Sequence, residues 1–177
     1  MKNKKVFLTE KIGHLDGSML LHYINMTPNI WLKNQFRQNL YGLESTESIL
    51  VFYNTENAKA MSPLQMTDNR TIVSQLQPFI REINRLTELN ELSRMLIAKL
   101  PQKMNIGLHK DPIEFSDYQR FHWVLQTNEN CHMQVNTKKY FFGKNEIWAF
   151  ENQKIHGATN NGDSDRIHLI ADFKKTV

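Results

Sequence analysis

Three residues in the last third of the chain have the chemistry and the spacing of a metal site. His109 and Asp111 stand two positions apart, so in an extended strand both side chains point the same way and can occupy adjacent sites on one metal ion. The second imidazole must come from elsewhere in the fold, and His156 is the best-placed candidate. Two histidines and one carboxylate leave coordination positions open, which is the ligand arrangement of non-haem Fe(II) oxygenases.

Other histidines compete for this assignment, because His-x-Asp is a weak signal in a chain with seven histidines. His132 is a rival to His156 as the second imidazole. His14 and His22 fall in the helical part of the chain and are interpreted as surface or packing residues. The single cysteine, Cys131, is interpreted as a packed strand residue and not as a nucleophile.

Arg166 follows His156 closely enough to serve the same site. Asn161-Gly162 between them is a strong hairpin signal. A turn centred there places Arg166 opposite about residue 159, roughly 10 Å along the strand from His156. A guanidinium at that position could bind the far carboxylate of a five-carbon diacid whose other end chelates the metal. The alternative is a surface ion pair between Arg166 and one of the two aspartates just before it.

The elements that must position these residues are mainly short strands. Turn sequences separate strand-like segments in the second half of the chain, which we expect at 104–109, 119–127, 131–136, 139–142, 146–150, 155–160 and 166–173. Earlier strands are predicted at Lys5–Leu8, Ser48–Tyr53 and Ser93–Leu100. Evenly spaced strands after a helix-rich start indicate a β-barrel or sandwich with helices packed on one side.

Two helices are predicted before the barrel. Asp16 could cap the first, whose expected apolar face is formed by Met19, Leu20, Tyr23 and Ile24. The segment from Ile72 to Leu86 has the most regular helical spacing of apolar residues in the chain and predicts a packing helix. Pro78 lies within it and indicates either a kink or the start of a fresh helix.

Two of the predicted strands combine an apolar face with a face that mixes arginine and histidine. In Arg120–Gln126, Arg120 and His122 alternate with aromatic and aliphatic residues, and the strand at 166–173 repeats the pattern. The simple interpretation is apolar core against solvent. In a small barrel that holds a ligand, the polar face points inward and helices cover the apolar face.

Composition limits the class of protein to which this chain can belong. A chain of 177 residues with 40% hydrophobic residues and no low-complexity tract predicts one folded domain. Nucleic-acid binding is not expected despite the net charge of +4, because basic residues form runs only at the two ends. One cysteine excludes an intrachain disulfide, and no signal peptide or membrane span is recognisable, so we expect a cytoplasmic protein.

The run from His109 to Phe173 resembles the aspartyl/asparaginyl β-hydroxylase family of Fe(II)/2-oxoglutarate oxygenases. The matching positions are His109-Lys110-Asp111, Arg120-Phe121-His122, Thr127-Asn128, Gly143–Phe150, His156, Asn160, Arg166 and Asp172. The similarity is specific over this run and loose before it.

The resemblance implies a mainly β fold of the α+β class, a double-stranded β-helix of jelly-roll or cupin-like type with N-terminal helices packed on one face. In one domain spanning 1–177, residues 1–100 are expected to give helical and strand support and 101–177 the β-helix core. The metal ligands implied for Fe(II) are His109, Asp111 and His156. By the same resemblance Arg166 meets the far carboxylate of 2-oxoglutarate, and Arg120 and His122 belong to the co-substrate or substrate pocket.

The implied activity is that of a 2-oxoglutarate-dependent Fe(II) dioxygenase. It would use O2 to hydroxylate an amino-acid or peptidyl side chain and release succinate and CO2, so a small molecule or a peptide is the expected partner. A lipid or another small metabolite is the alternative substrate within the same chemistry. A cupin-like binding module without turnover is the alternative from a different class.

Overall fold

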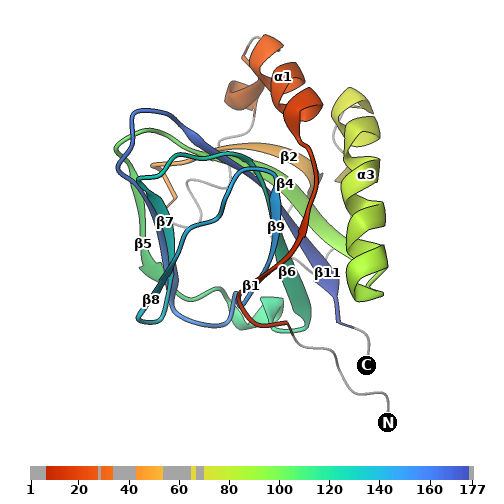
Figure 1. The fold of residues 1–177 in the computed structure, drawn as a ribbon. Helices are drawn as coiled ribbons and strands as arrows, with labels where there is room; N and C mark the ends of the chain where they lie inside the picture. The colour runs from red at the N-terminus through yellow and green to blue at the C-terminus, as the bar shows by residue number, and fades with distance from the viewer. Residues whose placement is uncertain (1–6, 28, 34–42, 54–64, 67–69, 176–177) are drawn as a thin grey trace.

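The computed structural model of the chain describes residues 7–27, 29–33, 43–53, 65–66 and 70–175. Within them, two antiparallel sheets face each other (Figure 1). The larger sheet contains, in spatial order, β1 (Glu10–His14), β9 (Glu146–Phe150), β6 (Tyr118–Gln126), β11 (Arg166–Lys174), β4 (Leu92–Leu100), β2 (Glu47–Tyr53) and β3 (Gln65–Met66). The smaller sheet contains β5 (Asn105–His109), β10 (His156–Asn160), β7 (Cys131–Val135) and β8 (Lys138–Tyr140).

This arrangement is a double-stranded β-helix, so the predicted fold class is confirmed. Successive strands alternate between the two sheets over much of the second half of the chain. The walls also include β2 and β4, which lie before residue 101. The strands predicted from residue 48 onward agree with the observed ones to within two residues at each end.

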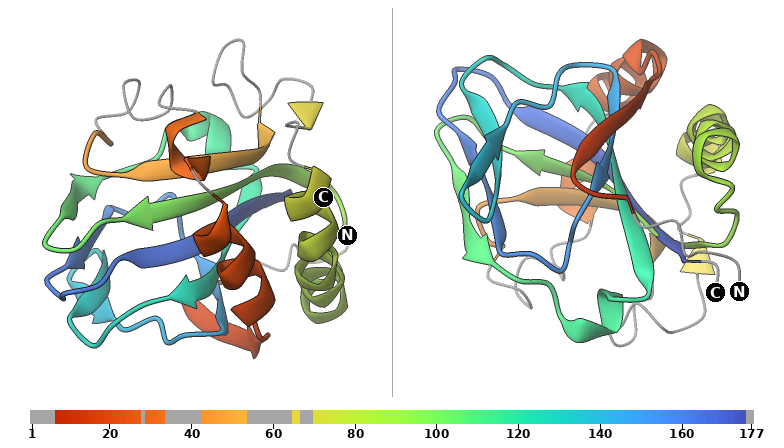
Figure 2. Two further views of the ribbon diagram at one scale, coloured as in Figure 1. Left: turned by 90° about the horizontal axis from the view of Figure 1, so that it is seen from above. Right: turned by 60° about the horizontal axis from the view of Figure 1, so that its bottom comes forward.

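The α-helices in the described ranges cover the larger sheet. The helices α1 (Ser18–Met26) and α3 (Arg70–Thr87) lie on its outer side (Figures 1 and 2). Short 3-10 turns, η1 (Ile30–Lys33) and η2 (Ile113–Phe115), complete the described helical structure.

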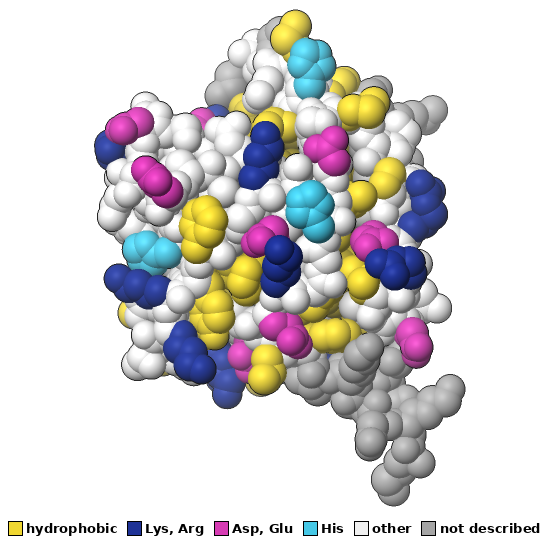
Figure 3. All heavy atoms as spheres, viewed as in Figure 1, with side chains coloured by type: hydrophobic (Ala, Val, Ile, Leu, Met, Phe, Trp, Pro, Cys, Tyr) yellow, Lys and Arg dark blue, Asp and Glu magenta, His cyan; other side chains and the backbone are white. Residues whose placement is uncertain are grey.

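No helix in the described part of the chain is both long enough and apolar enough to traverse a lipid bilayer. Acidic and basic side chains are interspersed on the face shown in Figure 3.

The helix α3 packs as its periodicity predicts. Its buried side chains belong to the main hydrophobic core, and the ring of Phe79 stacks on Trp123 of β6 with centroids 5.5 Å apart. Pro78 is exposed and does not start a new helix, because α3 continues through it. In α1 the expected face is only partly right: Leu20 and Ile24 are buried, whereas Met19 is 79% exposed.

The strands β6 and β11 are neighbours, and their two faces differ as the alternation predicts. The apolar residues of both strands join the core beneath the helices. The polar residues on the opposite face are buried as well: Arg120, His122, Arg166, His168 and Asp172. The simple interpretation of this face as solvent-facing is therefore wrong, and the barrel interior is polar along these two strands.

The predicted hairpin between β10 and β11 is wrong. The strand β10 pairs with β5 and β7, whereas β11 pairs with β4 and β6, so the connecting turn crosses from one sheet to the other. Arg166 consequently faces Leu100 and not residue 159. The fully buried amide of Asn160 stabilises the crossing, because it donates to the carbonyl oxygens of Leu100, Pro101 and Ser164.

The first strand also departs from expectation. The prediction at Lys5–Leu8 falls partly outside the described residues, and Phe7 and Leu8 are not in a strand. The observed strand β1 pairs with β9, and its register shifts between Lys11 and Gly13. Such an irregularity interrupts the apolar–polar alternation by which a strand is recognised.

Candidate metal centre

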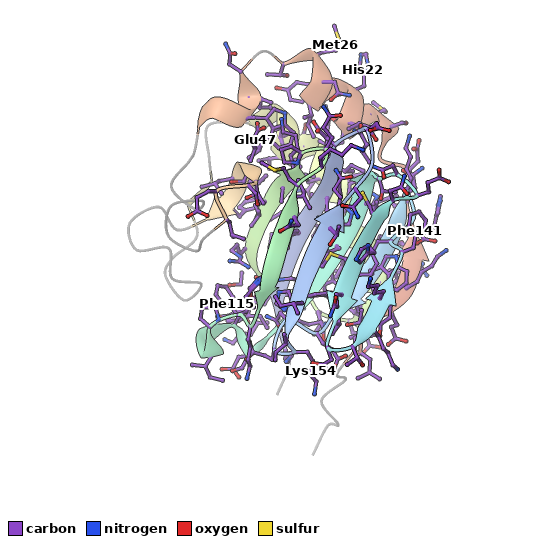
Figure 4. The ribbon with its side chains drawn as sticks, turned by 90° about the vertical axis from the view of Figure 1, so that its left-hand side faces the viewer. His22, Met26, Glu47, Phe115, Phe141 and Lys154 are labelled. Carbon is purple, nitrogen blue, oxygen red and sulfur yellow. The ribbon has the colours of Figure 1, made fainter. Side chains whose placement is uncertain are left out.

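His109, Asp111 and His156 lie together at one end of the barrel. His109 ends β5, His156 begins β10, and the two are Cα partners across the smaller sheet. Oδ1 of Asp111 is 3.7 Å from Nε2 of His109 and 3.6 Å from Nε2 of His156. One ligand atom from each residue lies within 4.8 Å of the others, close enough to share one metal ion. In Figure 4 Phe115 and Lys154 mark this end of the barrel, and Glu47 marks the other.

Backbone carbonyls orient both imidazoles. Nδ1 of His109 is 2.9 Å from the carbonyl oxygen of Gly107, and Nδ1 of His156 is 2.8 Å from that of Lys154. A carbonyl only accepts hydrogen bonds, so each Nδ1 carries a proton and each Nε2 is the ring atom left to face a metal. Burial lowers the pKa of His156 to about 4, against the opposing charge of Asp111. A neutral imidazole is the form that binds metals.

The other histidines considered as ligands lie elsewhere. His132 alternates in β7 with buried Met133 and therefore points to the opposite side of the sheet. His14 and His22 are exposed. Within the described ranges, His109, Asp111 and His156 form the one group of three or more such side chains whose ligand atoms converge.

A buried chain of charges supports Asp111. The Nη1 atom of Arg120 contacts Oδ2 of Asp111, which leaves Oδ1 facing the histidines. Arg120 also donates from Nε and Nη2 to Asp172, at 2.8 and 3.2 Å. Nη2 of Arg94 lies 2.5 Å from the same carboxylate. Burial acts to lower the pKa of Arg120, but the charges of Asp111 and Asp172 outweigh it and raise that pKa.

Arg166 has a different environment. It is 4% exposed, and its Nη2 atom donates to Sδ of Met133 and to Nδ1 of His168, both at 2.9 Å. Arg166 pairs with no carboxylate in the part of the chain that the structure describes, and burial lowers its pKa to about 10. The alternative of a surface ion pair is wrong: Asp163 pairs with Lys103, and Asp165 accepts from the backbone of Gln102. A buried cation with only neutral partners is costly and attracts an anion.

One cavity of about 240 Å³ connects these groups. It is lined by the three convergent side chains and by Arg120, His122 and Arg166, with apolar residues between them. His122 is 4% exposed, and its Nδ1 lies 3.3 Å from Nδ1 of His168. Burial, followed by the charge of Arg166, lowers the pKa of His122 well below 6.5, so this imidazole is neutral.

A sequence profile of the aspartyl/asparaginyl beta-hydroxylase family matches residues 35–176. The chain belongs to this family. Over 82 residues it is 30% identical to L-proline cis-4-hydroxylase of Rhizobium meliloti (strain 1021). That match covers 46% of this chain and 29% of the relative, so the chain spans less than a third of that protein.

The fold is also that of a solved oxygenase. An oxidoreductase of the 2OG-Fe(II) oxygenase family from Burkholderia pseudomallei superposes with a TM-score of 0.57 at 12% identity, covering 75% of this chain and 69% of the other. The family predicted from the sequence is thus confirmed, and this β-hydroxylase family member has the expected barrel.

Sequence reasoning missed two buried residues of this β-hydroxylase family member. Arg94 is the Cα partner of Asp172 across β4 and β11, a pairing that no sequence pattern reveals. His168 lies two positions after Arg166 on the same face of β11. The alternation in that strand had marked His168 as a member of the polar face, but not as the partner of Arg166.

Proposed function

We propose that this protein is an Fe(II)- and 2-oxoglutarate-dependent dioxygenase that hydroxylates an amino-acid or peptidyl side chain. One observation carries the proposal: a two-histidine, one-carboxylate group shares one cavity with a buried arginine that has no carboxylate partner among the residues described. The first can hold a metal with open positions, and the second can bind an anion at a distance from the metal.

The residues present fit Fe(II). His109 and His156 would offer Nε2, Asp111 would offer Oδ1, and their convergence on one side of a metal would leave the cavity side open. Iron bound there would supply the centre at which O2 and 2-oxoglutarate react, so that one oxygen atom enters the substrate and the other enters succinate, with release of CO2. Arg120 would hold Oδ2 of Asp111 and so keep Oδ1 directed at the metal.

Arg166 would bind the co-substrate. Its guanidinium has a geometry suited to two parallel hydrogen bonds with the far carboxylate of 2-oxoglutarate. The other end of the co-substrate would then point toward the metal ligands along the same cavity. Apolar side chains of Leu100, Met133 and Ala158 line this path and exclude water from it. Exclusion of water strengthens the attraction between guanidinium and carboxylate.

The size of the cavity favours a small substrate. Its volume of about 240 Å³ is below the range of about 300–1,000 Å³ usual for pockets that hold drug-sized ligands. With 2-oxoglutarate bound, the remaining space suits an amino-acid side chain better than a lipid. The partial match to a protein named L-proline cis-4-hydroxylase supports an amino acid as substrate.

Anaerobic titration of the metal-free protein with Fe(II) and 2-oxoglutarate tests the proposal. The wild type should develop the visible charge-transfer band of the chelated complex, and the His156→Ala variant should not. Release of succinate upon addition of free amino acids or short peptides would then identify the substrate class. A wild-type protein that binds both components without the band would contradict the proposal and favour a binding module.

A further inference from the structure

Three arginines are buried along the polar face of the barrel, and one of them differs from the others in its partners. Arg94 and Arg120 pair with Asp172, and Arg120 also contacts Asp111. Arg166 instead donates to two neutral acceptors, of which the nitrogen acceptor is Nδ1 of His168 at 2.9 Å. The difference suggests that His168 has a role that an aspartate could not fill.

The contact fixes the tautomer of His168. A guanidinium nitrogen can only donate, so Nδ1 of His168 must accept, and the proton of the neutral imidazole is on Nε2. The ring is fully buried and lies almost parallel to that of Phe142, at a centroid distance of 6.0 Å and an angle of 11°. His122 approaches it edge-on at 5.5 Å and is itself 5.9 Å from Phe142, so the three rings pack against one another. The position of Nδ1 is therefore set by the packing of the core.

We propose that His168 is a positioning residue for Arg166, which holds the guanidinium in place with a neutral acceptor and leaves its positive charge available to a carboxylate ligand. His168 does not line the cavity and so acts through Arg166. The inference rests on the proposed function, because the carboxylate is taken to be the far end of 2-oxoglutarate. A carboxylate at position 168 would hold Arg166 but neutralise it, whereas an aliphatic side chain would leave the charge but remove the nitrogen acceptor, with Sδ of Met133 left as the weaker of the two.

Three variants separate these effects: His168→Asn, His168→Leu and His168→Asp. The amide oxygen of asparagine can take the place of Nδ1 as a neutral acceptor, leucine removes the acceptor, and aspartate supplies a charged one. Binding of 2-oxoglutarate to protein loaded anaerobically with Fe(II) is measured by calorimetry. Fe(II) binding alone and thermal stability are measured in parallel, so that no readout depends on turnover.

We expect the asparagine variant to bind 2-oxoglutarate within a few-fold of the wild type. The leucine variant should bind it about tenfold more weakly, as expected for loss of one hydrogen bond to a charged group. The aspartate variant should show no detectable binding, and all three should keep wild-type Fe(II) affinity. A packing role alone predicts the reverse order, with leucine tolerated best and the two polar residues worst, and that order would overturn the inference.

Failure of the inference differs from failure of the proposed function. A wild type that does not bind 2-oxoglutarate contradicts both. If the wild type binds it and Arg166→Met abolishes binding, while His168→Leu binds as tightly as the wild type, only the role of His168 is overturned. Should the leucine variant not fold, the asparagine and aspartate variants decide, because they have nearly the same volume and differ in charge. Equal affinity in these two would overturn the inference.

Discussion

Asp172 and Arg120 face each other across β11 and β6, and the carboxylate accepts hydrogen bonds from two nitrogens of the guanidinium. Asp172 is fully buried and has Arg94 as its partner on the other neighbouring strand. The carboxylate therefore stands between two buried cations. Since Arg120 also contacts Asp111, the orientation of a proposed metal ligand depends on a residue that does not touch the metal.

Replacement of Asp172 by asparagine should strongly destabilise the protein. It leaves two buried arginines with less compensating charge, and loss of one partner of a buried ion pair costs about 3–5 kcal/mol. Urea unfolding of Asp172→Asn measures the effect. Glu82→Gln is a matched control, because the Glu82–Arg85 pair is exposed and its loss should change the midpoint little. Equal effects of both substitutions would contradict this account.

Loss of His156 should abolish binding of divalent metals, whereas loss of His132 should not. The two histidines lie on adjacent strands of the smaller sheet, but only His156 converges with His109 and Asp111. Titration with Fe(II) or Mn(II) by calorimetry compares His156→Ala with His132→Ala. Retention of wild-type affinity in the His156 variant would refute the ligand assignment.

Substitution of Arg166 by methionine should separate co-substrate binding from stability. Removal of a buried cation that lacks a carboxylate partner among the described residues should raise the free energy of unfolding by about 1 kcal/mol or more. The same substitution should abolish binding of 2-oxoglutarate and leave Fe(II) affinity within a few-fold of the wild type. Urea unfolding and calorimetry give the two readouts. Parallel losses of metal and 2-oxoglutarate binding would exclude the anchoring role.

Stability should fall as the pH drops below 6.5, because of the buried histidines. Burial lowers the pKa of His122 and His168 well below 6.5 in the folded protein, so below that pH the unfolded chain binds protons that the folded protein does not. Each histidine then reduces the free energy of unfolding by about 1.4 kcal/mol per pH unit. Unfolding in urea between pH 7 and pH 5 measures this slope.

Two variants test the origin of the pH dependence. His168→Leu should flatten the slope between pH 6.5 and 5, whereas substitution of the exposed His22 by glutamine should not change it. Asp172 contributes in a different range: burial opposes ionisation, but the charges of Arg120 and Arg94 lower its pKa, so its contribution is lost only below pH 3.8. An unchanged slope in His168→Leu would show that the loss of stability has another source.

The sequence was sufficient for the fold and for residues linked by local spacing. Period-two alternation in β6 and β11 predicted two unlike faces and the burial of the apolar one, but by itself it left open whether the polar face meets solvent or the barrel interior, where the structure places it. The i, i+2 spacing of His109 and Asp111 predicted that the two side chains lie together, and they do, although His109 is the last residue of β5 and Asp111 lies two positions beyond it. Both patterns are local in sequence.

Relationships across strands could not be predicted in the same way. Asn161-Gly162 has the composition of a hairpin turn, yet the side chain of Asn160 holds the chain in a crossing between sheets, so local turn preference was overridden. The pairing of Arg94 with Asp172 depends on the register between β4 and β11. The register is set by packing of whole sheets and not by the two residues involved.

The two proposed attachment points for 2-oxoglutarate lie on opposite walls of the barrel. His109 and His156 belong to the four-stranded sheet, and Arg166 belongs to the seven-stranded sheet. A dicarboxylate bound at both ends would therefore act as a noncovalent cross-link between the sheets. Binding favours the folded state by mass action. Amide hydrogens in β4 and β11 should therefore exchange more slowly together with those in β5 and β10, although the metal end is attached to one sheet and the far carboxylate to the other.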